Sequence, residues 1–215
     1  MLAERLPVAS DARNRLVRRA LWLEYFTVGW NVLEGIVAIS AGAVAGSIAL
    51  IGFGLDSGIE VTSGAILIWR FRQHGMGDDV ETAAERRAIF VVGVTFLLLA
   101  LYVTVEALRK LWLQERPEES MLGILVTLLS LALMPSLAIF KRRIAGQLGS
   151  RALLADAKET LACSYLSVTV LLGLGANALF GLWWADPVAA LAIVYWLVRE
   201  GREALAEARD EGEDD

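Results

Sequence analysis

The sequence has few of the residues that build cross-linked or nucleic-acid-binding proteins: one cysteine, one histidine and a small net charge of -5. The single cysteine, Cys163, excludes a disulfide within the chain and therefore a disulfide-stabilised scaffold. No basic stripe dominates any segment, so we do not expect a nucleic-acid partner. Charged residues make up only 21% of the 215 residues, whereas 56% are hydrophobic. This composition excludes a disordered chain and indicates a membrane protein.

Long apolar segments account for most of the chain. A helix needs about 20 mostly apolar residues to cross about 30 Å of hydrocarbon. Six such segments lie near residues 20–45, 47–71, 88–113, 121–140, 152–179 and 181–199. They predict an all-α, polytopic membrane domain of six transmembrane helices over residues 20–203. We expect a basic cytoplasmic arm over residues 1–19 and an acidic, disordered tail over residues 204–215.

The positions of lysine and arginine predict the orientation of these helices. Most of them fall in the N-terminal arm, in the second and fourth connections and after the last segment. The opposite side carries only Arg109, Lys110 and Arg116. Because basic residues favour the cytoplasmic side, both termini are expected in the cytoplasm. We therefore expect a multi-pass protein of the inner cell membrane.

Two of the apolar segments contain ionisable side chains at positions where an apolar residue would enter the membrane without cost. The second segment carries Asp56 and Glu60, and the fifth carries Glu159 and Cys163. A carboxylate near the bilayer centre costs about 2.5–3.5 kcal/mol on insertion scales, so such residues are functional by default. Each pair is separated by four positions, which places both side chains on one helix face. Like charges at this spacing repel, so we expect a cation to bind between them.

Helix geometry predicts that the two pairs share one site. At a rise of about 1.5 Å per residue, Asp56 lies roughly 14 Å and Glu60 roughly 20 Å from the outer surface. The fifth segment runs the opposite way, so Glu159 lies roughly 11 Å and Cys163 roughly 17 Å from the inner surface. Asp56 is then level with Cys163, and Glu60 with Glu159. Three carboxylates and one thiol supply the four ligands of a tetrahedral divalent site.

The charge of such a site predicts how it would work. Four ionised ligands carry twice the charge of a divalent ion, so the empty site should hold protons. Metal binds as these protons leave, and alternating exposure of the site would exchange metal for protons. A thiol favours Zn or Cd, whereas carboxylates alone suit Mg, Ca or Mn. We therefore expect Zn or Cd first, with Fe, Co and Mn left open.

The candidate residues also have structural interpretations. The acid pair could be a polar seam, Glu159 could extend toward the inner interface, and Cys163 could be a small buried hydrophobic side chain. In the first segment, Asn31 and Glu34 lie three apart on one face. They could support the ligands or line an access path, and Glu34 could contact the ion. Hydrogen bonding between helices is an equal alternative for both residues.

Two further features lie toward the cytoplasm. Asp156 shares the helix face of Glu159 and Cys163, where it could steer cations inward or cap the helix. His74 lies near Asp78 in the second connection. A weak metal site there is possible, although a solvated loop is the simpler interpretation.

Four stretches of the chain carry motifs of a known family. They are SIALIGFGLDSGIEV, LALYVTVEALRKLW with the following Pro117, ADAKETLACS and WADPVAALAIVYWLVREG. Together they resemble the cation diffusion facilitator family of divalent-metal transporters over residues 20–203. The resemblance implies that the two pairs ligate a transported ion and that a proton gradient drives efflux in bacterial members. It also implies a homodimer.

The sequence departs from the family pattern in two ways. Glu159 stands where the family usually has His, and Cys163 stands where it usually has Asp. The family's usual metal preference therefore does not carry over. Only EGREALAEARDEGEDD follows the last segment, so we expect a short member without the ferredoxin-like cytoplasmic domain. Homodimer contacts would then lie between membrane helices.

Three functions remain in competition. The first is export of a divalent metal, Zn or Cd, from the cytoplasm by proton-coupled alternating access, with the ion as cargo and no resident cofactor. The second is a metal-binding membrane modulator without transport activity. The third, an intramembrane hydrolase, is weakest, because no His-Glu-x-x-His motif and no Ser/His pair accompany the site. We therefore expect no enzyme, and the expected partners are the metal ion, protons and the lipid bilayer.

Overall fold

The described part of the chain consists of six helices, which confirms the predicted all-α fold. The computed structural model describes residues 6–73 and 83–210. Its helices are α1 (Leu6–Ala45), α2 (Ile48–Gln73), α3 (Ala83–Leu113), α4 (Met121–Leu148), α5 (Arg151–Phe180) and α6 (Ala185–Asp210). By length and composition, α1 to α5 can each cross a membrane. The sixth helix is apolar in its first half and charged from Arg199 onward.

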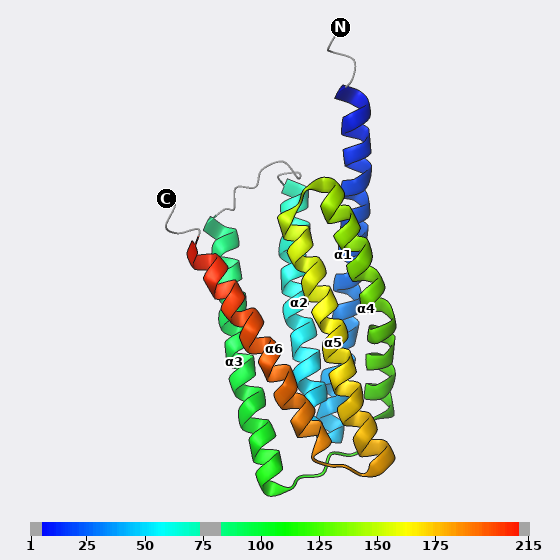
Figure 1. Cartoon of the computed structure of the whole chain (residues 1–215), viewed down its shortest axis with the longest axis vertical. Coiled ribbons are helices and arrows are strands. Elements are labelled where there is room, and N and C mark those ends of the chain that lie inside the picture. The colour runs from blue at the N-terminus through cyan, green and yellow to red at the C-terminus, as the bar shows by residue number, and fades with distance from the viewer. Residues whose placement is uncertain (1–5, 74–82, 211–215) are drawn as a thin grey trace.

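The helices form one elongated bundle (Figure 1). The α1–α2, α3–α6 and α4–α5 pairs make the most extensive contacts, and α5 also packs against α2 and α6. The described chain begins and ends at the same end of the bundle, as an even number of crossings requires (Figure 1). Which side of the membrane this end faces stays a prediction.

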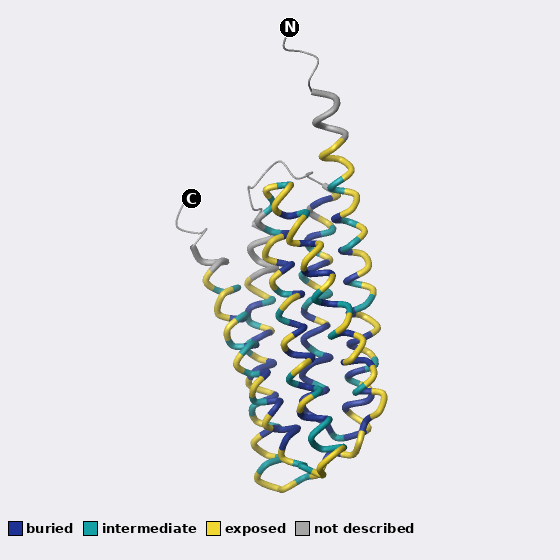
Figure 2. Tube along the Cα trace, turned by 45° about the vertical axis from the view of Figure 1, so that its right-hand side comes forward, coloured by how far each residue is buried: buried dark blue, intermediate teal, exposed yellow. Residues whose placement is uncertain are grey.

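Large apolar side chains cover the outside of the bundle. Exposed residues follow the outer surface along most of its length, whereas buried residues line the inside (Figure 2). Ile36, Leu101, Leu172 and Leu179 are among the exposed apolar side chains. A water-soluble bundle would bury such residues, whereas lipid solvates them. The surface therefore agrees with a protein embedded in a membrane.

Glycines allow α1 and α2 to approach closely. A Cβ atom added at Gly54 would lie 2.8 Å from Cγ1 and 2.9 Å from the backbone nitrogen of Ile39. One added at Gly42 would lie 2.9 Å from the backbone nitrogen of Ile51. Real Cβ atoms do not come this close to backbone, so only glycine fits at both positions. Small residues of this kind are how membrane helices come into tight contact.

The turn between α1 and α2 is held in place by two other helices. Gly46 has a left-handed backbone, with φ of 65°, and its carbonyl oxygen accepts a hydrogen bond of 2.8 Å from Lys110 on α3. At the start of α2, the carboxylate of Asp186 on α6 accepts hydrogen bonds from the Ser47 hydroxyl and the Ile48 amide. A carboxylate at this position stabilises the first turn of a helix. These contacts fix the level of α2 in the bundle.

Helices α1 and α6 extend into the segments predicted as a basic arm and an acidic tail. Helix α1 already begins at Leu6, so residues 6–19 are helical and continuous with the first membrane helix, and their location in the cytoplasm stays a prediction. Residues 204–210 likewise continue α6. Alanine, leucine, glutamate and arginine, which fill this segment, are strong helix formers. Residues 1–5 and 211–215 lie outside the described residues.

The close approach of α1 and α2 can be tested with one methyl group. Gly54→Ala should lower the free energy of unfolding by about 1–3 kcal/mol, because the added Cβ overlaps Ile39. Thermal unfolding in detergent, followed by circular dichroism, measures the change. Gly29→Ala on α1 is the matched control, since a Cβ there meets nothing within 4 Å. Equal melting temperatures for the two variants would contradict the packing described above.

Candidate metal centre

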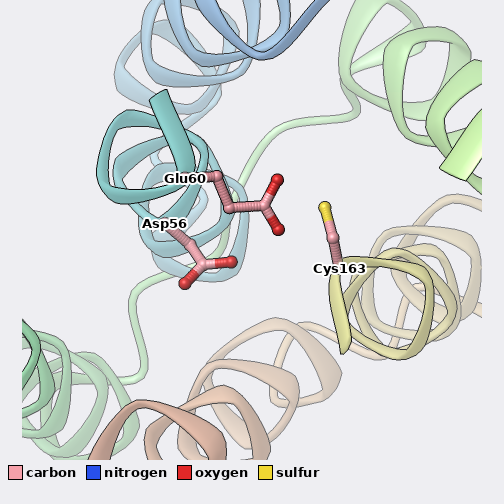
Figure 3. Close-up of side chains that lie close together, drawn as sticks. All are labelled: Asp56, Glu60 and Cys163. Carbon is pink, nitrogen blue, oxygen red and sulfur yellow. The ribbon is translucent and has the colours of Figure 1, made fainter. Parts of the chain in front are cut away.

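Three of the four predicted ligands lie together inside the bundle. Asp56 and Glu60 extend from α2, and Cys163 faces them from α5 (Figure 3). One carboxylate oxygen of each acid and the thiol sulfur all lie within 4.8 Å of one another. Ligand atoms on a tetrahedral zinc ion are about 3.3–3.8 Å apart, given bonds of about 2.0–2.3 Å. An inward movement of at most about 1 Å by each side chain would therefore let the three hold one ion.

The surroundings of this three-residue cluster exclude bulk solvent. Asp56 and Cys163 are buried, with 6% and 1% of their surfaces exposed, and Glu60 is partly buried. The four-residue spacing along α2 puts both acids on the face that α5 covers, as the sequence predicts. In such a setting the repulsion between the two acids is weakly screened, and a cation bound between them would be strongly attracted to both.

Glu159, the fourth predicted ligand, lies beside the cluster but outside it. Its Oε2 atom accepts a hydrogen bond of 2.8 Å from the hydroxyl of Ser63. Ser63 follows Glu60 by three residues, so Glu159 sits roughly 4.5 Å further along α2 than the predicted pairing with Glu60. Glu159 and Glu60 nevertheless line the same two cavities, one facing α1 and one facing α6. A role for Glu159 as a ligand stays a prediction.

Glu34 lies close to the thiol of Cys163, a contact that the sequence alone could not establish. Its Oε1 atom accepts a hydrogen bond of 2.7 Å from Ser57 and lies 3.8 Å from the sulfur of Cys163. Its Oε2 atom accepts a hydrogen bond of 2.7 Å from the indole of Trp30. Glu34 is fully buried. Glu34 therefore bonds to a neighbouring helix and also borders the cluster. Its contact with an ion stays a prediction.

Asn31 connects α1 directly to one of the candidate ligands. Its amide nitrogen donates a hydrogen bond of 2.6 Å to Oε2 of Glu60. The amide oxygen of Asn31 is buried and has no hydrogen-bond partner. Asn31 thus orients the Glu60 carboxylate from α1, and its free oxygen remains next to the cavity that faces α1.

Asp156 does not cap its helix. The cap of α5 is Ser150, whose hydroxyl accepts a hydrogen bond from the Leu153 amide. Asp156 instead accepts a hydrogen bond of 2.6 Å from the ammonium of Lys141 on α4. Lys141 also donates to Glu24 of α1 over 3.0 Å. Sequence reasoning missed both partners, although Glu24 is an unmatched acid inside the first apolar segment and could have been noticed.

The possible surface site around His74 lies outside the described residues. Its two acidic neighbours, Asp78 and Asp79, fall in the same gap between α2 and α3. The structure therefore bears only on the sites inside the bundle.

Comparison with known proteins adds a family and two relatives. Residues 27–211 match the cation efflux transmembrane domain. The chain is 28% identical to transmembrane protein 163 of Xenopus laevis over 155 residues, which are 72% of this chain and 54% of that protein. It is 26% identical over 175 residues to an uncharacterized transporter of Synechocystis, covering 79% of this chain and 56% of that protein. The chain thus spans about half the length of both relatives.

The position of Cys163 in the cluster gives a test that depends on the softness of the metal. Cys163→Ser should weaken Cd²⁺ binding far more than Mn²⁺ binding, because only the soft ion prefers sulfur to oxygen. Titration of the purified protein with each ion, measured by calorimetry, compares the two losses. If both ions lose the same affinity, Cys163 serves only in packing.

Proposed function

Because the chain belongs to the family of cation efflux transmembrane domains, we propose that it carries a divalent metal cation across the inner cell membrane. The observation that carries the proposal is the convergence of Asp56, Glu60 and Cys163 from two membrane helices. Acids buried at this depth are costly unless they serve a cation. The match is to a transport domain, and the proposal includes no enzymatic activity.

The proposed site takes its ligands from α2 and α5. Asp56, Glu60 and Cys163 supply three ligands, and the fourth comes from Glu159 after a small shift of its carboxylate away from Ser63. A thiol in the ligand set favours Zn or Cd over Mg and Ca, with Fe, Co and Mn as weaker candidates. The ion is cargo, so the ligands hold it only during its passage.

Exchange with protons would supply the driving force. Carboxylates close together in a low-dielectric interior favour their protonated forms when no metal is bound. A metal ion can bind only as those protons leave, so loading from the cytoplasm and reprotonation from the other side would complete a cycle of export. The hydrogen bond from the thiol of Cys163 toward Glu34 supports this view, because the thiol must lose that proton to bind metal.

The proposal also includes a homodimer whose contacts lie between membrane helices. The resemblance to cation diffusion facilitators supports this assembly. The apolar outer faces of the helices are available for such contacts as well as for lipid (Figure 2).

Reconstitution into proteoliposomes tests transport directly. With a metal-sensitive dye inside and an imposed pH gradient, the wild type should move Zn²⁺ or Cd²⁺ against the flow of protons. Asp56→Ala and Glu60→Ala should each abolish this flux, because each removes a ligand. Glu106→Gln is the matched control, since it removes a carboxylate that pairs with Arg109 on α3. Metal binding by the wild type without any flux would instead support a membrane modulator that does not transport.

A second test decides which acid completes the ligand set. Glu159→Gln should weaken Cd²⁺ binding by at least about 100-fold, whereas Glu34→Gln should weaken it by about tenfold, as expected for a residue that only orients a ligand. Competition with a fluorescent chelator in detergent measures both affinities. The reverse order would make Glu34 the ligand and would remove Glu159 from the site.

A further inference from the structure

A buried lysine lies between the candidate metal centre and the end of the bundle where α4 ends and α5 begins. Lys141 has no exposed surface. Its ammonium donates hydrogen bonds to Glu24 of α1, Asp156 of α5 and Thr160 of α5, over 3.0, 2.6 and 3.3 Å. All three of its donors are therefore used. We call Glu24, Lys141 and Asp156 the lysine triad.

The lysine triad contains one more acid than base. Two carboxyl groups face one ammonium, so without metal one of them must hold a proton or remain a negative charge with no partner in the triad. Glu24 is fully buried, and its Oε1 atom has no hydrogen-bond partner. A buried polar atom without a partner is rare in folded proteins and costs stability. The charge of a divalent cation would balance that of two carboxylates, whereas the single charge of the ammonium does not.

A narrow cavity lies between the lysine triad and the candidate metal centre. Its walls include two members of the triad, Glu24 and Asp156, the cluster acid Glu60, and Glu159 beside the cluster. The unpartnered oxygen of Asn31 belongs to a residue on the same wall. Polar side chains from α1, α2 and α5 thus form a continuous strip that leads from the triad to the cluster.

We propose that Glu24 and Asp156 form a second station for a divalent cation on the cytoplasmic side of the cluster, and that Lys141 occupies this station until the cation displaces it. The inference rests on the transport function and orientation proposed above. Because Glu24 and Asp156 offer only carboxylate oxygen, the station suits a hard ion such as Mn²⁺ as well as the transported one.

The position of Lys141 allows its ammonium to leave the carboxylates of Glu24 and Asp156. The residue lies two turns before the end of α4, and its neighbours Arg142 and Arg143 are exposed. A lysine side chain near a helix end can extend to the headgroups while its stem stays in the apolar region. The ammonium would then act as an internal competitor that keeps the acidic strip neutralised while no metal is present.

A purely structural role is the competing explanation. A buried ion pair holds helices together, but well-packed apolar residues usually do so equally well or better. The two roles differ in one measurable respect, because a structural lysine stays bound to both carboxylates throughout transport, whereas a competitor must leave them when the metal arrives.

The test uses Mn²⁺ alone and a protein whose cluster has been disabled. In D56N/E60Q Mn²⁺ should bind only at concentrations high enough to displace the ammonium. In D56N/E60Q/K141M one equivalent should bind at concentrations where the double variant binds none, counted by electron paramagnetic resonance in detergent. D56N/E60Q/E24Q/K141M is the matched control: it loses the same ammonium and one station carboxylate, so binding should disappear again. A folded triple variant that binds no Mn²⁺, or equal binding in the quadruple variant, overturns the station.

K141R, made in the otherwise unchanged protein, keeps the proposal testable if the triple variant does not fold. A guanidinium holds carboxylates through a rigid fork of donors and leaves them less readily than an ammonium. Transport in proteoliposomes should therefore slow by about tenfold or more, whereas Cd²⁺ affinity at the cluster stays within about twofold. An unchanged transport rate overturns the proposal. A failure of the transport proposal can be told apart from a failure of the station. The first would appear as wild-type protein that shows no flux, whereas Mn²⁺ binding by the triple variant does not depend on flux.

Discussion

Carboxylates held inside a bundle of membrane helices are the constraint on which the rest of this structure depends. Seven acids face inward from four helices: Glu24 and Glu34 from α1, Asp56 and Glu60 from α2, Asp156 and Glu159 from α5, and Asp186 from α6. Among the described residues, Lys141 is the one buried cation. Each acid therefore needs a hydrogen-bond donor, a proton or an external cation to be tolerated there.

Much of the polar chemistry of the interior follows from this need for donors. Ser57 and Trp30 donate to Glu34, Asn31 donates to Glu60, and Ser63 donates to Glu159. Most of these donors are short side chains, so they reach a neighbouring helix only where two helices lie close together. The glycines at which α1 meets α2 provide that proximity. Close packing and the chemistry of the site are therefore one feature of the fold.

The site divides its tasks among helices. Helices α2 and α5 carry the candidate ligands, α1 orients them through Asn31 and encloses them with Glu34, and α4 supplies the single buried ammonium. A protein that exchanges cations between two sides of a membrane must change which acids are neutralised at each step. Acids arranged at successive levels, with a buried ammonium at one end, are suited to that exchange.

The sequence by itself determined the local features. Hydropathy indicated the membrane helices, because the length and apolar character of a span are properties of a continuous segment. The four-residue spacing placed Asp56 with Glu60 on one helix face, because the helical period is fixed by backbone geometry. The motifs pointed to the family that residues 27–211 then matched.

Tertiary structure alone decided how the helix faces meet. The rotation and level of each helix result from side-chain packing between segments far apart in sequence, which no local pattern contains. Packing set α5 against α2 so that Glu159 meets Ser63 rather than Glu60. It also turned Lys141 inward to Glu24, 117 residues away. A lysine beside two arginines at a helix end looks like a cytoplasmic surface charge until the helices that enclose it are in place.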